Sequence, residues 1–133
     1  MKNAVIKQGG RTVIAMAHVP ALPGSPDYKL HEGMQKLHDW VGRDIEALQS
    51  GGVDAIMFGN EFDRPYVLKA PPEGLAALTA VVTEAKKTLK VPFGVNYLWD
   101  PVATVALASA TGASFAREIY TGVYASDMGL WVP

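Results

Sequence analysis

Short apolar segments alternate with longer amphipathic ones along this chain, and the alternation limits its fold more than any single motif does. The short segments lie at residues 12–19, 53–58, 93–98 and 114–119, and the first two are apolar on both faces, as buried strands are. Between the short segments, apolar residues recur at intervals of three and four, which is the spacing of a helix with one buried face. The sequence therefore predicts four strands joined by three helices.

Each predicted helix has recognisable ends. The first carries its apolar stripe over residues 30–48 and ends at Gly51 and Gly52, because glycine tolerates the left-handed conformation that follows a last turn. The second begins after Pro71 and has its apolar face over residues 75–89. The third is short and Ala-rich and follows Asp100, whose carboxylate can cap free amides at a helix start.

Because every connection between strands carries a helix, the strands are expected to be parallel and the crossovers right-handed. Residues 121–133 show no clear helix and are interpreted as a loop. Two α/β architectures fit this order: a doubly wound open sheet, or part of a (β/α)8 barrel. No glycine-rich turn follows the first strand, which weakens the dinucleotide-binding version, so no nucleotide cofactor is expected.

The composition excludes several classes of protein. Twelve Lys and Arg residues against thirteen Asp and Glu residues, with a pI of 6.3, leave no basic stripe for a nucleic acid. The absence of cysteine rules out disulfides and zinc–thiolate sites, and a reducing cytoplasm is the simplest compartment. No apolar run approaches the roughly 18 residues that span a membrane, so we expect no membrane partner.

Polar side chains cluster where the predicted strands end, which is where parallel α/β folds place their reacting groups. An imidazole or a carboxylate there can move protons, and amides can orient hydroxyls or a divalent metal. A buried amide such as Asn96 costs about 1–3 kcal/mol if it is left unpaired, which favours a ligand or a network there. Trp99 packs in the fold or forms the apolar wall of a pocket. The candidate site residues are His18, Asn60, Asp63, Asn96, Arg117, Glu118 and Asp127.

Several of these positions also have a purely structural interpretation, and the sequence leaves both open. His18 can hydrogen-bond a loop carbonyl, and Asp63 can close a turn. Asp100 is most economically a helix cap. Arg117 and Glu118 can form structural ion pairs with neighbouring strands. Because side chains alternate along a strand, only one of these two can point into a barrel, and the pattern does not say which.

Four ordered segments resemble the BtpA/SgcQ family. They are AMAHVPALPGSPDY at 15–28, GGVDAIMFGNEFDRPY at 51–66, PFGVNYLWDPVA at 92–103 and TGASFAREIYTGVYASDMGLW at 111–131. The second and fourth segments are most similar to the SgcQ branch. Gly59 and Glu61 stand where many BtpA-type members have a glutamate and an aromatic residue, so a site taken from that branch is not transferred here.

The resemblance implies a (β/α)8 TIM barrel about twice as long as this chain, so that residues 1–133 correspond to its N-terminal half, about four βα units. A half-barrel leaves both edge strands unpaired and half of the apolar interior open, which promotes association. We therefore expect either a truncated product or a half-barrel that self-associates through its edges, completed by a second copy.

For function, the resemblance implies two classes. One branch is named for photosystem I biogenesis, which suggests a non-catalytic assembly or stability factor. The SgcQ branch is associated with sugar-uptake and sugar-metabolism genes, which suggests an enzyme acting on a sugar or sugar phosphate. We favour the enzyme, with acid/base chemistry of the isomerase, epimerase or aldolase type, although the chain can be inactive if truncated. In this hypothesis His18 or Glu118 moves the proton, and Arg117 holds an anionic group.

Overall fold

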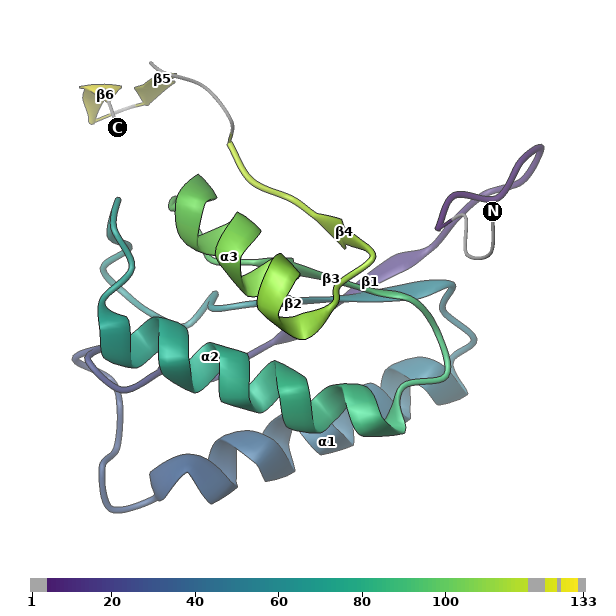
Figure 1. Cartoon of the computed structure of the whole chain (residues 1–133), viewed down its shortest axis with the longest axis horizontal. Helices are drawn as coiled ribbons and strands as arrows, with labels where there is room; N and C mark the ends of the chain where they lie inside the picture. Colours follow the sequence, from purple (N-terminus) through teal and green to yellow (C-terminus); the bar gives the residue numbers. More distant parts are fainter. Residues whose placement is uncertain (1–4, 120–123, 127, 132–133) are drawn as a thin grey trace.

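The main sheet has four parallel strands in the order β1-β2-β3-β4 (Figure 1). The computed structural model describes residues 5–119, 124–126 and 128–131. The strands are β1 (Ile14–His18), β2 (Ala55–Gly59), β3 (Phe93–Asn96) and β4 (Phe115–Ala116). All four predicted strands and their parallel direction are thus confirmed, although the fourth is only two residues long.

The three predicted helices are also present and lie side by side in chain order, α1 against α2 and α2 against α3 (Figure 1). They are α1 (Gly33–Ser50), α2 (Pro72–Ala85) and α3 (Pro101–Thr111), and a short 3-10 helix, η1 (Lys86–Thr88), extends α2. The expectation that Leu30 belongs to the first helix is wrong, since Leu30 precedes α1 and is 82% exposed. Gly33, the first residue of α1, has a left-handed φ of 63°, so the chain changes direction there and residues 30–32 do not continue the helix.

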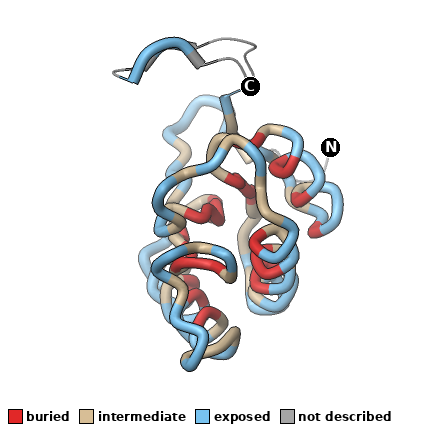
Figure 2. The backbone as a smooth tube through the Cα atoms, turned by 90° about the vertical axis from the view of Figure 1, so that its left-hand side faces the viewer, coloured by how far each residue is buried: buried red, intermediate tan, exposed pale blue. Residues whose placement is uncertain are grey.

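Alternate strand residues face the helices and build one core between the two layers. Its strand side consists of Ala17, Val19, Ile56, Phe58, Val95 and Tyr97. Its helix side includes Leu37, Val41, Ile45, Leu78, Val81, Val82 and Leu107. Figure 2 shows the buried positions gathered on the inner sides of strands and helices. Because burying each large aliphatic side chain contributes roughly 1.5–3 kcal/mol, this core is the main source of stability.

The arrangement of layers decides between the two architectures that the sequence left open. The strands follow one another in chain order, and in the described part of the chain the helices pack on one face of the sheet. A doubly wound sheet reverses its strand order and carries helices on both faces. The chain is therefore an α/β fold of the (β/α)8 type, with four parallel strands and the three helices that join them in the described residues.

The opposite face of the sheet corresponds to the interior of such a barrel. The Phe115 ring lies over Gly94, where an added Cβ would come within 2.3–2.5 Å of three ring atoms. Met57 is 2% exposed, and the Met16 side chain lies against Gly59. A side chain larger than hydrogen at position 94 would therefore force the Phe115 ring to move.

The interpretation of residues 121–133 as a loop is wrong in part. Strands β5 (Tyr124–Ser126) and β6 (Gly129–Trp131) pair antiparallel. Strands of three residues are too short to show a clear alternating pattern, so the sequence did not indicate them. Gly129 has a positive φ of 105°, which a glycine adopts without steric cost at the start of β6.

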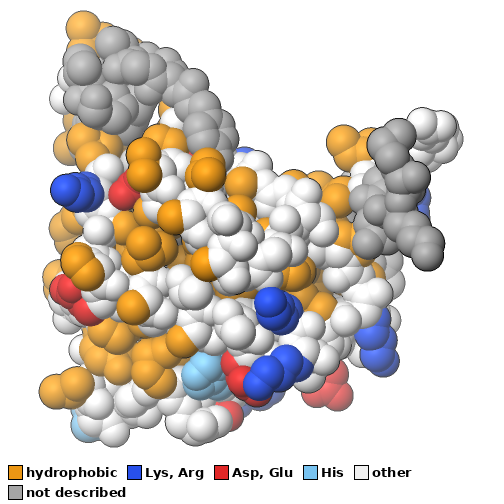
Figure 3. Space-filling view, viewed as in Figure 1, with side chains coloured by type: hydrophobic (Ala, Val, Ile, Leu, Met, Phe, Trp, Pro, Cys, Tyr) orange, Lys and Arg blue, Asp and Glu red, His pale blue; other side chains and the backbone are white. Residues whose placement is uncertain are grey.

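Apolar side chains also reach the surface on the face seen in Figure 3. Val102 and Val105 of α3 are 79% and 54% exposed. None of the helices in the described ranges is long and apolar enough to cross a membrane.

Candidate functional site

The ends of β1, β2 and β3 align in one row across the sheet. His18 pairs with Gly59, and Gly59 pairs with Asn96. The backbone N–H of Arg117 donates to the carbonyl of Val95, so the chain beyond β4 stays in register with β3. The carboxyl ends of the strands thus place His18, Asn96, Arg117 and the following residues on one edge, as predicted.

Asn96 and Glu118 form the central contact of this edge. The Asn96 side-chain Nδ2 donates to Glu118 Oε2 at 2.6 Å and to the carbonyl oxygen of Arg117 at 2.7 Å. Both partners can only accept, which fixes the orientation of the amide. Asn96 is 2% exposed, so its amide is buried and satisfied rather than unpaired. The network expected for Asn96 is therefore present.

Thr104 extends this network from α3. Its hydroxyl accepts a hydrogen bond from the N–H of Tyr97 at 2.8 Å and lies 3.4 Å from Glu118 Oε2. Thr104 is fully buried, and it also contacts the Tyr97 carbonyl at 3.1 Å. Thr104 was not predicted from the sequence, because a threonine in an apolar helix does not indicate a functional role until the helix is packed on the sheet.

Arg117 and Glu118 differ in their surroundings. Glu118 is half-buried and hydrogen-bonded to an amide, whereas Arg117 is exposed and forms no ion pair with any described residue. The structural ion pair considered for these residues is thus absent from the described part of the chain. Both residues line an open pocket of about 270 Å³. Its walls are Asn96, Leu98, Trp99, Arg117, Glu118 and Ile119.

Asn60 and Asp63 hold three loops together. Asn60 Oδ1 accepts from the backbone N–H of Leu98 at 2.7 Å, and its Nδ2 lies 3.3 Å from Asp63 Oδ2. Asp63 Oδ1 accepts from the N–H of Leu22 at 2.7 Å. Burial raises the pKa of the Asp63 carboxyl above its usual value, even though these donors favour the charged form. Both side chains already use their polar atoms between loops, and their binding of substrate stays a prediction.

Asp100 is a helix cap, as the sequence indicated. Its Oδ1 accepts from the N–H of Ala103 at 2.9 Å in the first turn of α3. Its Oδ2 accepts from the N–H of Ala70 at 2.7 Å, which also ties the loop before α2 to the start of α3. The carboxylate is therefore committed to backbone donors.

His18 lies apart from the Asn96–Glu118 pair. Its ring packs edge-on against Phe62, with ring centroids 6.1 Å apart. Three strand spacings separate β1 from β4, which is roughly 14 Å, so His18 and Glu118 cannot exchange a proton directly. The two residues predicted to move protons are not brought together. Asp127 lies outside the described residues.

Aromatic side chains line the same edge in the strand-end loops. The rings of Tyr66 and Trp99 are tilted against each other at a centroid distance of 5.4 Å. The Tyr66 hydroxyl donates to the Glu61 carbonyl oxygen at 3.0 Å. Phe62 and Tyr66 were missed by the sequence analysis, although aromatic residues in a loop after a strand were visible in NEFDRPY.

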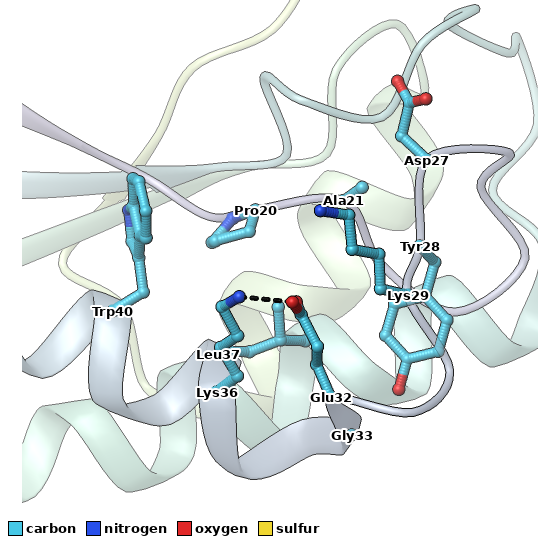
Figure 4. Close-up of a pocket in the computed structure, with 10 residues that line it drawn as sticks. All are labelled: Pro20, Ala21, Asp27, Tyr28, Lys29, Glu32, Gly33, Lys36, Leu37 and Trp40. Carbon is cyan, nitrogen blue, oxygen red and sulfur yellow. Dashed lines mark ion pairs between the residues drawn. The ribbon is translucent and has the colours of Figure 1, made fainter.

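Two further features bear on ligands. Within the described residues, no group of three His, Asp or Glu side chains is placed to hold a metal ion. A second pocket of about 180 Å³ lies between the loop after β1 and the start of α1, where Lys36 and Glu32 form an ion pair at 2.5 Å (Figure 4). Trp40 and Lys29 stand on opposite sides of it (Figure 4). No candidate site residue lines this second pocket.

Comparison with known proteins bears on the fold and the family of the chain. A solved structure of dihydropteroate synthase from Xanthomonas albilineans superposes with a TM-score of 0.57 at 16% identity, covering 82% of this chain and 36% of that one. This likeness supports the barrel-type fold alone.

Sequence relatives are more similar. SgcQ, an sgc region protein of Escherichia coli, is 52% identical over 91% of this chain and 45% of its own length. The photosystem I biogenesis protein BtpA of Synechocystis is 33% identical over 89% of this chain and 42% of its own. A protein of Pyrococcus horikoshii is 34% identical over 90% and 46%. The chain thus spans about half the length of these relatives. Residues 9–133 match the BtpA family, and the chain belongs to that family.

Proposed function

We propose that residues 1–133 form the N-terminal half of a barrel domain whose enzyme acts on a sugar or sugar phosphate by acid–base proton transfer. The observation that carries this proposal is the 2.6 Å bond between Asn96 and Glu118 in the wall of the pocket that also holds Arg117. A carboxylate positioned by a buried amide can act as a base, and a nearby guanidinium that has no ion-pair partner among the described residues can bind a phosphate.

The proposed reaction begins at a carbon next to the carbonyl group of the substrate. The Glu118 carboxylate takes a proton from that carbon, and the electron pair of the broken C–H bond moves into the carbonyl to give an enediolate. Return of the proton to the former carbonyl carbon, together with transfer of the hydroxyl proton between the two enediolate oxygens, isomerises the sugar. Delivery of a proton from water to the opposite face of the first carbon epimerises it, and the hydroxide that is left takes the proton from Glu118. Asn96 and Thr104 hold the carboxylate in place.

The other predicted site residues take different places in this proposal. Arg117 binds the phosphate of the substrate, and its exposure leaves its five N–H donors accessible. Asn60 and Asp63 shape the loops through their contacts with Leu98 and Leu22. His18 is too distant to relay protons to Glu118, so its proposed role is to polarise a group at the far end of a bound substrate. A divalent metal remains a prediction without support from the described residues.

Solvent deuterium exchange tests the proposal. The purified chain is incubated in D2O with a panel of aldose and ketose phosphates, and proton NMR follows the signal of the hydrogen next to the carbonyl. We expect exchange with wild-type protein and loss of exchange in Glu118→Gln, which keeps the hydrogen-bonding shape but removes the base. Arg117→Gln is expected to weaken binding of the phosphorylated sugars and to leave neutral sugars unaffected. Exchange that is equal in wild type and Glu118→Gln would refute the assignment.

A further inference from the structure

Trp99 adopts a backbone conformation that a tryptophan rarely takes. It lies between β3 and α3 with a φ of 70°, in the left-handed region. A residue with a Cβ is disfavoured there, and glycine or asparagine is the usual occupant. In the described part of the chain it is the one non-glycine residue with a positive φ. Strain of this kind gathers at ligand sites, where the surrounding structure maintains it.

The indole is also backed by an oriented ring. Tyr66, from the loop after β2, packs against Trp99 with centroids 5.4 Å apart and planes at 58°. The Tyr66 hydroxyl is itself placed by the Glu61 carbonyl oxygen at 3.0 Å and by Glu61 Oε1 at 3.2 Å. The direction of the Trp99 ring is therefore set by a contact from another loop as well as by its own backbone.

The pocket that Trp99 lines has an apolar and a polar part. Leu98, Trp99 and Ile119 supply apolar surface, and Asn96, Arg117 and Glu118 supply polar groups. Its volume of about 270 Å³ is just below that of most ligand pockets, which hold roughly 300–1,000 Å³. A pocket divided in this way matches a small ligand with one apolar and one polar face. A pyranose ring is such a ligand, because its C–H groups lie on one face and its hydroxyls point outward.

We propose that Trp99 is a positioning residue for a cyclic sugar, with its indole stacked on the C–H face of the ring. This inference rests on the proposed function and adds the form in which the substrate is first bound, a phosphorylated sugar ring. The ring then opens, with the anomeric hydroxyl losing a proton and the ring oxygen gaining one, and this gives the carbonyl compound on which Glu118 acts. The negative face of an aromatic ring attracts the positively polarised C–H groups, while Arg117 binds the phosphate. Stacking of this kind requires a flat C–H face, which an open-chain polyol does not present.

The consequence is a preference between two ligands of similar size and charge. Glucose 6-phosphate is mostly cyclic, whereas sorbitol 6-phosphate has the same six-carbon backbone and phosphate but no ring. We expect the wild-type chain to bind the cyclic compound about tenfold more tightly, since one aromatic contact of roughly 1.4 kcal/mol corresponds to that factor. Trp99→Gly should reduce this ratio to about one, and Trp99→Phe should retain part of it.

The experiment measures dissociation constants of both compounds by NMR titration of the full 133-residue chain, with the unfolding temperature of each variant as a second readout. Trp40→Phe is the matched control, because Trp40 lies on α1 beside Arg43 and lines a different pocket. A merely structural Trp99 would change the unfolding temperature of Trp99→Gly and leave the ratio of the two dissociation constants as in wild type. If Trp99→Gly fails to fold, the partial loss of the ratio in Trp99→Phe carries the test.

The outcomes separate this inference from the proposed function. If the wild type binds both phosphates equally and catalyses deuterium exchange, the stacking role of Trp99 is overturned and the enzyme assignment stands. If it binds neither compound and exchanges no deuterium, both fail. A ring preference that disappears in Trp99→Gly and persists in Trp40→Phe supports the inference.

Discussion

Replacing Asn96 by aspartate tests the contact on which the proposed site depends. In the wild type, Asn96 Nδ2 donates to Glu118 Oε2 at 2.6 Å. The substitution keeps the shape of the side chain but puts a carboxylate oxygen in place of this donor nitrogen. Two hydrogen bonds are lost, one to a carboxylate at about 1.5–3 kcal/mol and one to a carbonyl at about 0.5–1.5 kcal/mol. Asn96→Ala loses the same two bonds without adding a charge, so it is the matched control.

The difference between the two variants comes from the added charge. At pH 7.5, Asn96→Asp places two like charges in a partly buried contact, and we expect it to be less stable than Asn96→Ala by about 3 kcal/mol, equal to roughly two pKa units. One carboxyl of the new pair binds a proton more tightly in the folded state than in the unfolded state. Stability of Asn96→Asp therefore rises as the pH falls.

Urea denaturation followed by circular dichroism at pH 7.5 and pH 5 measures this difference. At pH 5 we expect most of the difference in free energy of unfolding between Asn96→Asp and Asn96→Ala to disappear. Asn96→Ala should follow the wild-type pH dependence. If Asn96→Asp is unfolded at pH 7.5, its refolding on acidification gives the same information. Identical free energies of unfolding for the two variants at both pH values would refute the hydrogen bond from Asn96 to Glu118.

Three further predictions concern packing, titration and association. Gly74→Ala should destabilise the chain by about 1–3 kcal/mol, because the new Cβ would lie 2.5 Å from the Tyr97 hydroxyl, and Tyr97→Phe should relieve most of that cost in a urea-denaturation double-mutant cycle. Burial raises the pKa of the Asp63 carboxyl, so the folded state binds its proton more tightly than the unfolded state does. The free energy of unfolding should therefore decrease as the pH rises through the pKa of this carboxyl in the folded state. Asp63→Asn should remove this decrease from a pH series of urea midpoints. In the described sheet β1 and β4 each pair on one side only, so light scattering should show a mass that increases with concentration, and a monodisperse monomer would contradict self-association.

The helices and strands could be predicted because each depends on the pattern of its own neighbouring residues. Apolar periodicity and caps placed the helices, and Asp100 was recognised as a cap from its position before Pro101. The length of β4 could not be predicted, because SFAREI has the composition of a longer strand and pairing with β3 at Gly94 and Val95 limits it. The start of α1 was missed because Leu30 fits the apolar spacing but lies before a left-handed Gly33.

The candidate site was predictable as a set of positions but not as a set of contacts. The rule that parallel strands end at one edge placed Asn96 and Glu118 together, yet their bond joins residues 22 apart in sequence. The same rule grouped His18 with Glu118, and the strand order separates them. Asn60 and Asp63 were expected at the site, and the structure shows their polar atoms bound to the backbone of Leu98 and Leu22.

The sequence by itself determined the alternation of strands and helices, the parallel direction of the strands and the membership of the chain in an α/β class. These follow from periodicity and connection length, which are properties of neighbouring residues. Only the tertiary structure decided that the helices cover one face of the sheet, that Thr104 contacts Glu118 and that Trp99 packs against Tyr66. Such contacts depend on strand order, register and loop conformation, because a shift of one residue turns a side chain to the other face of a sheet.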